Sequence, residues 1–293
     1  MGTAMVVNLE VVLATFNGDL FLEEQLQSLW RQELRPDQLI VFDDGSTDST
    51  SNILEQWQQR HPAWIKRLPP ASERLGPTAA FNRLLQQSSA PYIALCDQDD
   101  VWHPERLATG LNILKQVEAS HPFGSQQPLL LHSDAELINS EGRPLNRTLW
   151  EWHHYGGELP GLIELAQHNS VTGCTIILNR ALLQQALPIP GDAVFHDHWL
   201  ALVARHKGKI LSCSRPLLAH RRHRHNSSGK HPNWRGNAGL ALQRWQAKHQ
   251  QWKCFCVRYR LPAQKSLCWW PRAAINPIMR INFLSRAKYM RGQ

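Results

Sequence analysis

The 293-residue chain is 42% hydrophobic, enough for a large buried core, and no stretch approaches the roughly 18 uninterrupted apolar residues of a membrane-spanning helix. Its net charge of +8 is unevenly divided: residues 1–197 hold all 24 acidic and 12 basic side chains, whereas residues 198–293 hold 20 basic side chains and no acidic one. Composition therefore argues against an integral membrane protein, and the basic C-terminal third predicts a polyanionic partner: a membrane surface, nucleic acid or a substrate diphosphate.

Strand and helix patterns alternate through the first 120 residues. Short apolar runs predict strands at 6–16, 38–42, 64–68 and 91–96. Between and after them, apolar side chains recur every three or four residues, which predicts helices. The side chains expected on the buried helix faces are Leu22, Leu26, Leu29, Trp30, Ile53, Leu54, Trp57, Phe81, Leu84, Leu85, Leu107, Leu111 and Leu114. This alternation predicts an α/β fold with a mainly parallel central sheet and helices on both faces.

Local signals mark three of the helix starts in this half. Ser46 or Thr47 is expected to cap the second helix, because a hydroxyl oxygen there can accept a hydrogen bond from a free backbone N–H. Gly76 followed by Pro77 predicts the start of the third helix, since the first turn needs no N–H from proline. Pro104 is expected to open the fourth.

The pattern from residue 129 onward is mixed, and no internal repeat is present. Strands are predicted at 129–132, 175–178 and 210–218, and a short helix at 197–204. The aromatic segment 150–155 is expected to be a loop.

The composition changes after residue 229. Residues 231–293 contain 12 Lys or Arg, no Asp or Glu, and five tryptophans. We therefore expect a catalytic-type domain at 1–229 and a basic, helical C-terminal extension at 230–293, whose partner is an anionic membrane surface more readily than nucleic acid. The six cysteines form no C-x-x-C pair and the N-terminus lacks a basic signal-peptide region, so we expect reduced thiols and a cytoplasmic protein.

Carboxylates gather directly after two of the predicted strands. The turn 97–100 carries three of them and follows the strand 91–96, and the acidic turn 43–48 follows the strand 38–42. Ligands of open α/β sheets bind outside the carboxyl ends of the strands, so both turns are expected to face one site. Neighbouring carboxylates repel one another, and a divalent cation would offset that repulsion. Two ordinary helix-capping turns are the alternative.

An ordered series of motifs runs from about residue 11 to 229. The motifs are LATFNG at 13–18, FDDGSTD at 42–48, LGP at 75–77 with Asn82, DQDDVW at 97–102, VTGCT at 171–175, FHDHW at 195–199 and HRRH at 220–223. In this order they resemble the family 2 glycosyltransferases, inverting enzymes of the GT-A fold that use nucleotide sugars, and most of all the bacterial rhamnosyltransferase-like members. The chain has no G-x-G-x-x-G or P-loop motif, which argues against dinucleotide oxidoreductases and P-loop NTPases.

The resemblance implies a metal site and a nucleotide site. Asp99, with Asp97 nearby, suits Mg²⁺ or Mn²⁺, because such an ion takes few protein ligands when it also binds a diphosphate. His223 corresponds to a metal-ligating histidine of many relatives, although His220, His225 and His231 crowd the same basic segment and a solvated loop histidine is the alternative. The nucleotide site is implied to consist of Thr15, Asn17, Asp44 and Asp97, with Asp44 at the nucleobase and Asp97 near the ribose.

Asp197 is the predicted catalytic base. It opens a predicted helix and occupies the catalytic aspartate position of the family motif, with His196 in place of the acid that often precedes it. An exposed aspartate would be a weak base, so we expect partial burial and a raised pKa; a simple helix cap is the alternative. Trp199, His196 and Arg221 are assigned to acceptor or phosphate contacts. A place in the core is the alternative for Trp199.

The sequence thus predicts a metal-dependent, inverting glycosyltransferase of the hexosyl-transferring type. It would move a sugar from a nucleotide-sugar donor to a hydroxyl of a glycan or lipid-linked glycan, in bacterial surface polysaccharide synthesis at the inner face of the cell membrane. The alternative is a non-catalytic protein on an inactive α/β scaffold that binds nucleic acid or a membrane surface. Retention of all the site acids argues against that alternative.

Overall fold

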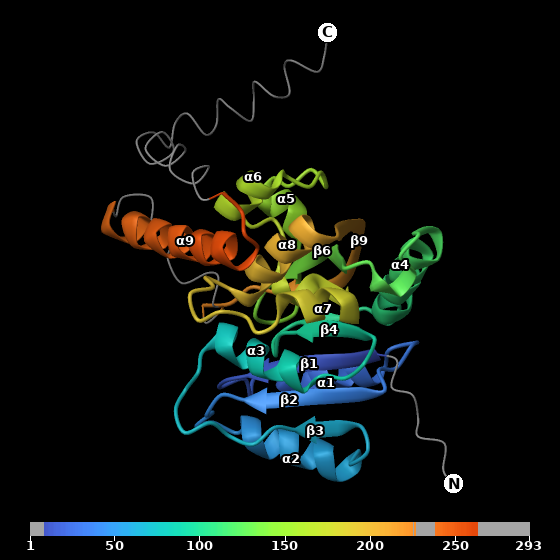
Figure 1. Cartoon of the computed structure of the whole chain (residues 1–293). Helices are drawn as coiled ribbons and strands as arrows, with labels where there is room; N and C mark the ends of the chain where they lie inside the picture. The colour runs from blue at the N-terminus through green and yellow to red at the C-terminus, as the bar shows by residue number, and fades with distance from the viewer. Residues whose placement is uncertain (1–8, 225, 227–237, 263–293) are drawn as a thin grey trace. The chain divides into compact units, whose positions relative to one another are not determined.

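The computed structural model describes residues 9–224, 226 and 238–262 (Figure 1). The chain divides into two compact units, Met1–Lys230 and His231–Gln293. The strands of the first unit are β1 (Leu9–Thr15), β2 (Gln38–Asp43), β3 (Ile65–Arg67), β4 (Tyr92–Cys96), β5 (Val101–Trp102), β6 (Leu129–Ile138), β7 (Pro144–Thr148), β8 (Ile176–Asn179) and β9 (Lys209–Arg221). Its helices are α1 (Leu22–Trp30), α2 (Thr50–Arg60), α3 (Pro77–Gln87), α4 (Arg106–Ser120), α5 (Leu149–His153), α6 (Leu162–Gln167), α7 (Arg180–Ala186) and α8 (His196–Lys207).

The strands form one mixed sheet in the order β3-β2-β1-β4-β8-β6-β9-β5, with β7 paired to β6 outside this path. Strands β3, β2, β1 and β4 are parallel, and so are β6 and β9. Strand β8 is antiparallel to both of its neighbours, β4 and β6, and so joins the two parallel groups. The predicted α/β fold is confirmed, with β8 as an antiparallel element that the sequence pattern did not indicate.

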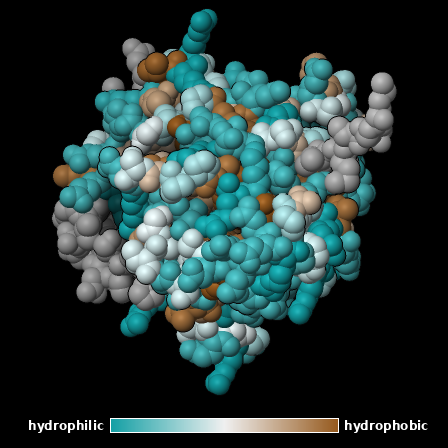
Figure 2. Space-filling model, turned by 90° about the horizontal axis from the view of Figure 1, so that it is seen from below, coloured by the Kyte–Doolittle hydropathy of each residue, from teal (hydrophilic) through white to brown (hydrophobic). Residues whose placement is uncertain are grey.

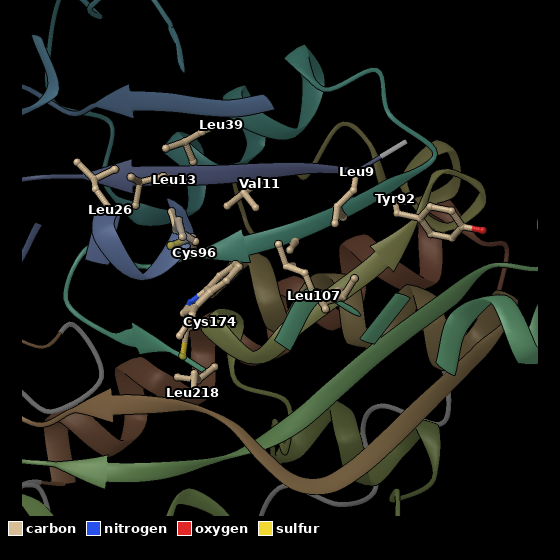
Figure 3. Close-up of a cluster of buried hydrophobic side chains, with 14 of the residues drawn as sticks. Leu9, Val11, Leu13, Leu26, Leu39, Tyr92, Cys96, Leu107, Cys174 and Leu218 are labelled. Atoms are coloured by element: carbon tan, nitrogen blue, oxygen red, sulfur yellow. The ribbon is translucent and has the colours of Figure 1, made fainter. Parts of the chain in front are cut away.

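Helices cover both faces of this sheet because alternate strand residues point to opposite sides. Val11 and Leu13 of β1 belong to a buried cluster that includes Leu26 of α1 and Leu107 of α4, and Figure 3 shows several of these side chains together. Val12 is equally buried but lies outside this cluster, on the side where α3 contacts β1 and β2. Each fully buried Val or Leu side chain stabilises the fold by about 1.5–3 kcal/mol.

The start of α2 differs from the prediction. The helix begins at Thr50, whose N–H donates to Asp48 Oδ1 at 3.0 Å, so the expected caps Ser46 and Thr47 are wrong. Ser46 instead hydrogen-bonds Asp43, and the backbone N–H of Thr47 donates to a neighbouring loop. The hydroxyl residues therefore serve the turn before the helix.

The starts of two further helices follow their prolines. α3 begins at Pro77 as predicted, and Gly76 before it has a φ of 78°, which favours glycine. α4 begins at Arg106, two residues after Pro104.

Several short elements were not predicted from the sequence: β5, β7, α5, α6 and α7. The segment 150–155 was expected to be a loop, but most of it belongs to α5. A reciprocal cap explains this helix, because Thr148 Oγ1 accepts a hydrogen bond from Glu151 N at 3.3 Å and Glu151 Oε2 accepts one from Thr148 N at 2.9 Å.

The second unit contains α9 (Ala238–Arg258), which corresponds to the helical pattern expected after residue 230. On this helix the rings of Trp245 and His249, one turn apart, stack with centroids 5.0 Å apart. Residues 230–237 and 263–293 of the predicted extension lie outside the described residues.

The face of the molecule seen in Figure 2 is mostly hydrophilic, with hydrophobic side chains scattered over it. None of the helices in the described part of the chain has the length and hydrophobicity needed to cross a membrane.

Candidate active site

Three parallel strands end at the same edge of the sheet, and a polar turn follows each of them. The register pairs Thr15 at the end of β1 with Asp43 at the end of β2, and Leu13 with Cys96 at the end of β4. The two acidic turns therefore flank β1, as the sequence predicted. This edge is where ligands of open α/β sheets bind.

Thr15 and Asn17 fasten the first acidic turn to the end of β1. Thr15 Oγ1 donates to Asp43 Oδ1 at 2.8 Å. Asn17 accepts from Thr47 N through its Oδ1 at 2.8 Å, while its own N–H donates to Ser46 Oγ at 2.8 Å. Asn17 has a φ of 48°, a left-handed conformation that asparagine tolerates better than most residues. These two predicted nucleotide-site residues thus shape the turn that carries Asp44.

Asp44 holds the loop before α3. Its two carboxylate oxygens accept hydrogen bonds from Leu75 N and Gly76 N, each at 2.7 Å, and its side chain is buried. The preceding Arg74 places its guanidinium 3.5 Å from the centroid of the Phe16 ring. Asp44, Arg74 and Phe16 thus lie together at the ends of β1 and β2, where the nucleobase is predicted to bind.

Gln98 joins the ends of β1 and β4. Its Oε1 accepts from Phe16 N at 2.8 Å and its Nε2 donates to Phe16 O at 3.0 Å, so its amide pairs with the backbone of a single residue. The side chain between the acids of the DQDD motif therefore fixes the distance between the two turns. The motif alone does not predict this role, because a glutamine amide in a turn can equally well be exposed to solvent.

The second acidic turn concentrates negative charge. Carboxylate oxygens of Asp97, Asp99 and Asp100 all lie within 4.8 Å of one another. Burial, with added repulsion from Asp100 and Asp99, raises the pKa of Asp97 well above its usual range, and the charge of Asp197 contributes to the same shift. Asp97 and Asp197, which are 100 residues apart in the sequence, therefore face one site.

His223 lies against Asp99. Its Nε2 is 2.7 Å from Asp99 Oδ2. Asn226 supports both residues, since its Oδ1 accepts from His223 N at 2.6 Å and its Nδ2 lies 3.4 Å from Asp99 Oδ2. The structure thus brings together the two residues predicted to bind the metal, and adds Asn226 as a residue that positions them.

Asp100 is fully buried and has different partners from Asp99. Its Oδ1 lies 2.9 Å from His220 Nδ1 and accepts from Arg221 N at 3.1 Å. Burial alone would lower the pKa of His220, but the charge and hydrogen bond of Asp100 and the charges of Asp99 and Asp97 together raise this pKa to about 9. Burial would raise the pKa of Asp100, but His220 and the hydrogen bonds to this carboxylate keep it below its usual range. This buried ion pair connects the end of β9 to the turn after β4, and neither partner was predicted to do so.

Asp197 sits at the start of α8 with an oriented carboxylate. Its oxygens accept from Asn169 Nδ2 and Gly173 N, both at 3.1 Å, and from His198 N at 2.5 Å. The residue is partly exposed, and desolvation raises its pKa to about 7, only partly offset by these hydrogen bonds. Asp197 therefore has the raised pKa expected of a base. It is not the N-cap of α8, which is Phe195, although its carboxylate accepts the N–H of His198 in the first turn.

Comparison with known proteins assigns the chain to a family. The model of "Glycosyl transferase family 2" matches residues 10–182, more than half of the chain. The chain belongs to glycosyltransferase family 2. This membership makes it a glycosyltransferase and disfavours the non-catalytic alternative.

Relatives and solved structures agree with this family. The dTDP-rhamnosyl transferase RfbG of Shigella flexneri is 25% identical over 259 residues, which cover 80% of this chain and 81% of the relative. TuaG of Bacillus subtilis, named as a teichuronic acid biosynthesis glycosyltransferase, is 23% identical over 277 residues, covering 92% and 96% of the two chains.

Two solved structures share the fold. The structure of S. aureus TarS with UDP-GlcNAc has a TM-score of 0.61 at 17% identity and covers 88% of this chain and 69% of TarS. The mannosyltransferase PcManGT of Pyrobaculum calidifontis, in complex with GDP-Man and Mn²⁺, has a TM-score of 0.56 at 17% identity over 97% and 80% of the two chains. The fold of this family 2 glycosyltransferase is thus of the GT-A type.

Two residues considered for the acceptor lie inside the glycosyltransferase domain. Trp199 is completely buried, and its Nε1 donates to Ala186 O at 2.9 Å, so the structure supports the core assignment. His196 is buried and stacks on Phe81 with ring centroids 3.9 Å apart, and burial lowers its pKa to about 3. Neither side chain is placed to contact an acceptor directly.

Arg221 was expected to contact phosphate, but the structure uses its guanidinium internally. Nε donates to Asp99 O at 3.0 Å, Nη1 to Ser140 O at 3.2 Å and Nη2 to Glu24 Oε2 at 2.5 Å. The side chain is only 2% exposed. Arg221 thus fixes the backbone of Asp99 instead of offering a free guanidinium.

The described residues at this edge fit a divalent cation. Asp99 and His223 present an oxygen and a nitrogen ligand side by side, and Asp97 adds a carboxylate. Burial and then the charges of Asp100 and Asp99 raise the pKa of Asp97, and a bound cation would relieve the repulsion among these carboxylates. Hard oxygen ligands with one imidazole suit Mg²⁺ or Mn²⁺.

Proposed function

We propose that this family 2 glycosyltransferase is metal-dependent and inverting, and that it transfers a sugar from a nucleotide-sugar donor to a hydroxyl of a glycan or lipid-linked glycan. The observation that carries the proposal is the 2.7 Å contact between Asp99 and His223 beside the carboxylate of Asp97. The Mn²⁺ bound by the P. calidifontis mannosyltransferase supports a divalent ion at such a site. Asp99 and His223 are the proposed ligands of Mg²⁺ or Mn²⁺.

The proposed chemistry is a single displacement. Asp197 takes the proton of the acceptor hydroxyl, whose oxygen forms a bond to the anomeric carbon while the bond from that carbon to the diphosphate breaks. A pKa near 7 makes this carboxylate a stronger base than an exposed aspartate, and the bonds from Asn169 and Gly173 hold it in one orientation. The bound ion would neutralise the diphosphate as it leaves.

The nucleotide is proposed to lie across the ends of β1 and β2. Thr15, Asn17, Asp44 and Asp97 are the proposed contacts, with Asp44 at the nucleobase and Asp97 near the ribose. Because the Shigella flexneri relative is a dTDP-rhamnosyl transferase, dTDP-rhamnose is the first candidate donor. The bacterial relatives, including one named for teichuronic acid biosynthesis, support a role in surface polysaccharide synthesis.

A hydrolysis screen tests this function. Full-length protein is incubated with a panel of nucleotide sugars in Mg²⁺, Mn²⁺ or EDTA, and release of the nucleoside diphosphate is measured. We expect slow, metal-dependent release from donors of one nucleotide, because water can replace the acceptor hydroxyl. Release that is equal in EDTA would contradict metal dependence, and no release from any donor would contradict the proposed donor class.

The extension at 230–293 is proposed to hold the enzyme against the inner face of the membrane. Basic residues near an anionic leaflet contribute on the order of 1 kcal/mol each, and aromatic side chains add interfacial contacts. We expect full-length protein to co-sediment with vesicles containing anionic lipid at low salt, and to be released as salt rises. Removing residues 231–293 should abolish this binding while nucleotide binding persists. Full-length protein that stays in the supernatant at low salt would contradict the proposal.

A further inference from the structure

The exposed ring of Trp152 contacts two arginine side chains. Trp152 of α5 is 43% exposed, the guanidinium of Arg222 lies 5.0 Å from its ring centroid, and that of Arg147 lies 5.5 Å from it. A cation over an indole face is a favourable contact, but two like charges on one ring also repel each other. The arrangement thus gathers positive charge at an exposed aromatic side chain.

Neither guanidinium has a counter-charge in the described part of the chain. The ion pairs there engage Arg74, Arg215 and Arg221, and the hydrogen bonds there include none from the guanidinium of Arg147 or Arg222. Glu151, the acidic residue closest in sequence, is occupied by its reciprocal cap with Thr148. An anionic ligand would therefore find two guanidinium groups whose donors are available.

The arginines come from two strands on either side of β6. Arg147 lies on β7, which pairs with β6, and Arg222 directly follows β9, whose Arg221 pairs with Ile138 of β6. Arg222 N donates to Ile138 O at 2.8 Å, which fixes its backbone at this point. Arg147 and Arg222 thus belong to the half of the sheet away from β1 and β2, where the nucleotide is proposed to bind.

Arg222 is also the neighbour of the metal-site residues. It stands between Arg221, which hydrogen-bonds Asp99 O, and His223, which contacts Asp99 Oδ2. The Asp99 and His223 pair therefore has the predicted nucleotide site on the β1 side and the two arginines on the β6 and β9 side. A group bound by the arginines would therefore lie on the side of the sheet away from the predicted nucleotide site.

We propose that Arg147, Trp152 and Arg222 form an anion-binding subsite for the acceptor, which holds a phosphate group of a phosphorylated glycan beside Asp99 and His223. The proposal rests on the transferase function above and names the acceptor's chemical class. Guanidinium groups bind phosphate oxygens in pairs, and the exposed indole offers an apolar surface to the adjoining sugar ring. A diphosphate linked to a lipid and a soluble sugar phosphate share this chemistry.

Calorimetric titration of inorganic diphosphate into full-length protein in EDTA tests the subsite. The variant Arg147→Ala/Arg222→Ala should weaken binding by about tenfold or more, because two charge-assisted contacts are lost. Arg147→Lys/Arg222→Lys keeps the charge without the paired donors and should give an intermediate affinity. The matched control is Arg60→Ala, which removes a guanidinium 4.8 Å from the ring of Trp57 on α2 and should change nothing. Equal diphosphate affinity in wild type and the double Ala variant would overturn the proposal.

A second titration separates acceptor from donor. Nucleoside diphosphate with Mn²⁺ should bind the double Ala variant and wild type alike; a parallel loss would place the arginines in the donor site and overturn the proposal. If nucleoside diphosphate does not bind wild type, the proposed function is contradicted. The titration with inorganic diphosphate still tests the subsite in that case. Competition by geranyl diphosphate would indicate a lipid-linked acceptor, and competition by glucose 1-phosphate a soluble one; competition by neither would overturn the assignment to a phosphorylated acceptor.

Discussion

Asp197→Asn should lower the rate of sugar transfer by roughly 10²–10⁴-fold while donor binding stays largely intact, because the amide keeps the shape of the side chain but cannot accept a proton. One hydrogen bond from Gly173 N or Asn169 is also lost, since the amide nitrogen cannot accept it. Single-turnover transfer and nucleoside-diphosphate titration measure the two effects separately. Asp192→Asn, at an exposed aspartate of the preceding loop, is the control and should behave as wild type.

The rate of sugar transfer by wild type should also depend on pH. Desolvation raises the pKa of Asp197 to about 7, so wild-type transfer should rise with pH as the carboxylate loses its proton, and should fall below pH 7. Because the folded-state pKa lies above the unfolded value, this residue makes the fold less stable as pH rises from about 4 to 7. The Asn variant has no carboxylate to ionise at this position and so avoids that loss of stability. A thermal melt at pH 8 should therefore show that the variant is folded. Near-wild-type transfer by this variant, with the same pH profile, would mean that another group is the base.

Asp99→Ala should abolish turnover and weaken nucleoside-diphosphate binding in Mn²⁺. The affinity loss should be at least the roughly 10- to 100-fold that follows removal of a residue supporting a metal ligand. In wild type, EDTA should reproduce the loss, whereas in the variant EDTA should change little, because the ion and the diphosphate no longer support each other.

Isothermal titration with and without EDTA measures all four affinities. The control is Glu33→Ala, which removes one carboxylate at an exposed position and should leave the four affinities unchanged. If wild type binds nucleoside diphosphate equally well in Mn²⁺ and in EDTA, neither Asp99 nor His223 binds a metal ion that supports nucleotide binding.

The sequence was sufficient to predict which edge of the sheet carries the candidate site. Apolar runs identified β1, β2 and β4, and parallel pairing of such strands necessarily brings the residues after them together. Asp44 and Asp97 could therefore be placed at one edge before any coordinates were known. Asp197 was predicted because it lies at the start of a helix and occupies the catalytic aspartate position of the family motif, and burial gives it the raised pKa that was expected.

The different roles of neighbouring residues could not be predicted in the same way. Asp99 and Asp100 are adjacent and chemically identical, yet one meets His223 at the surface of the site and the other meets His220 in the interior. The direction of each side chain depends on how β9 returns along β6, a pairing between residues about 80 positions apart. Arg221 was misjudged for the same reason, since nothing in its sequence neighbours reveals the carbonyls of Asp99 and Ser140 that it binds.

The amide of Gln98 restricts which side chains fit at position 18, which is 80 residues away in the sequence. A Cβ added to Gly18 would lie 2.3 Å from Gln98 Oε1, closer than any real side chain can approach. A larger residue at position 18 therefore requires the amide of Gln98 to move, and an amide that moves gives up its paired hydrogen bonds to Phe16. The two side chains share one space, so substitutions at positions 18 and 98 should be non-additive in their effect on stability.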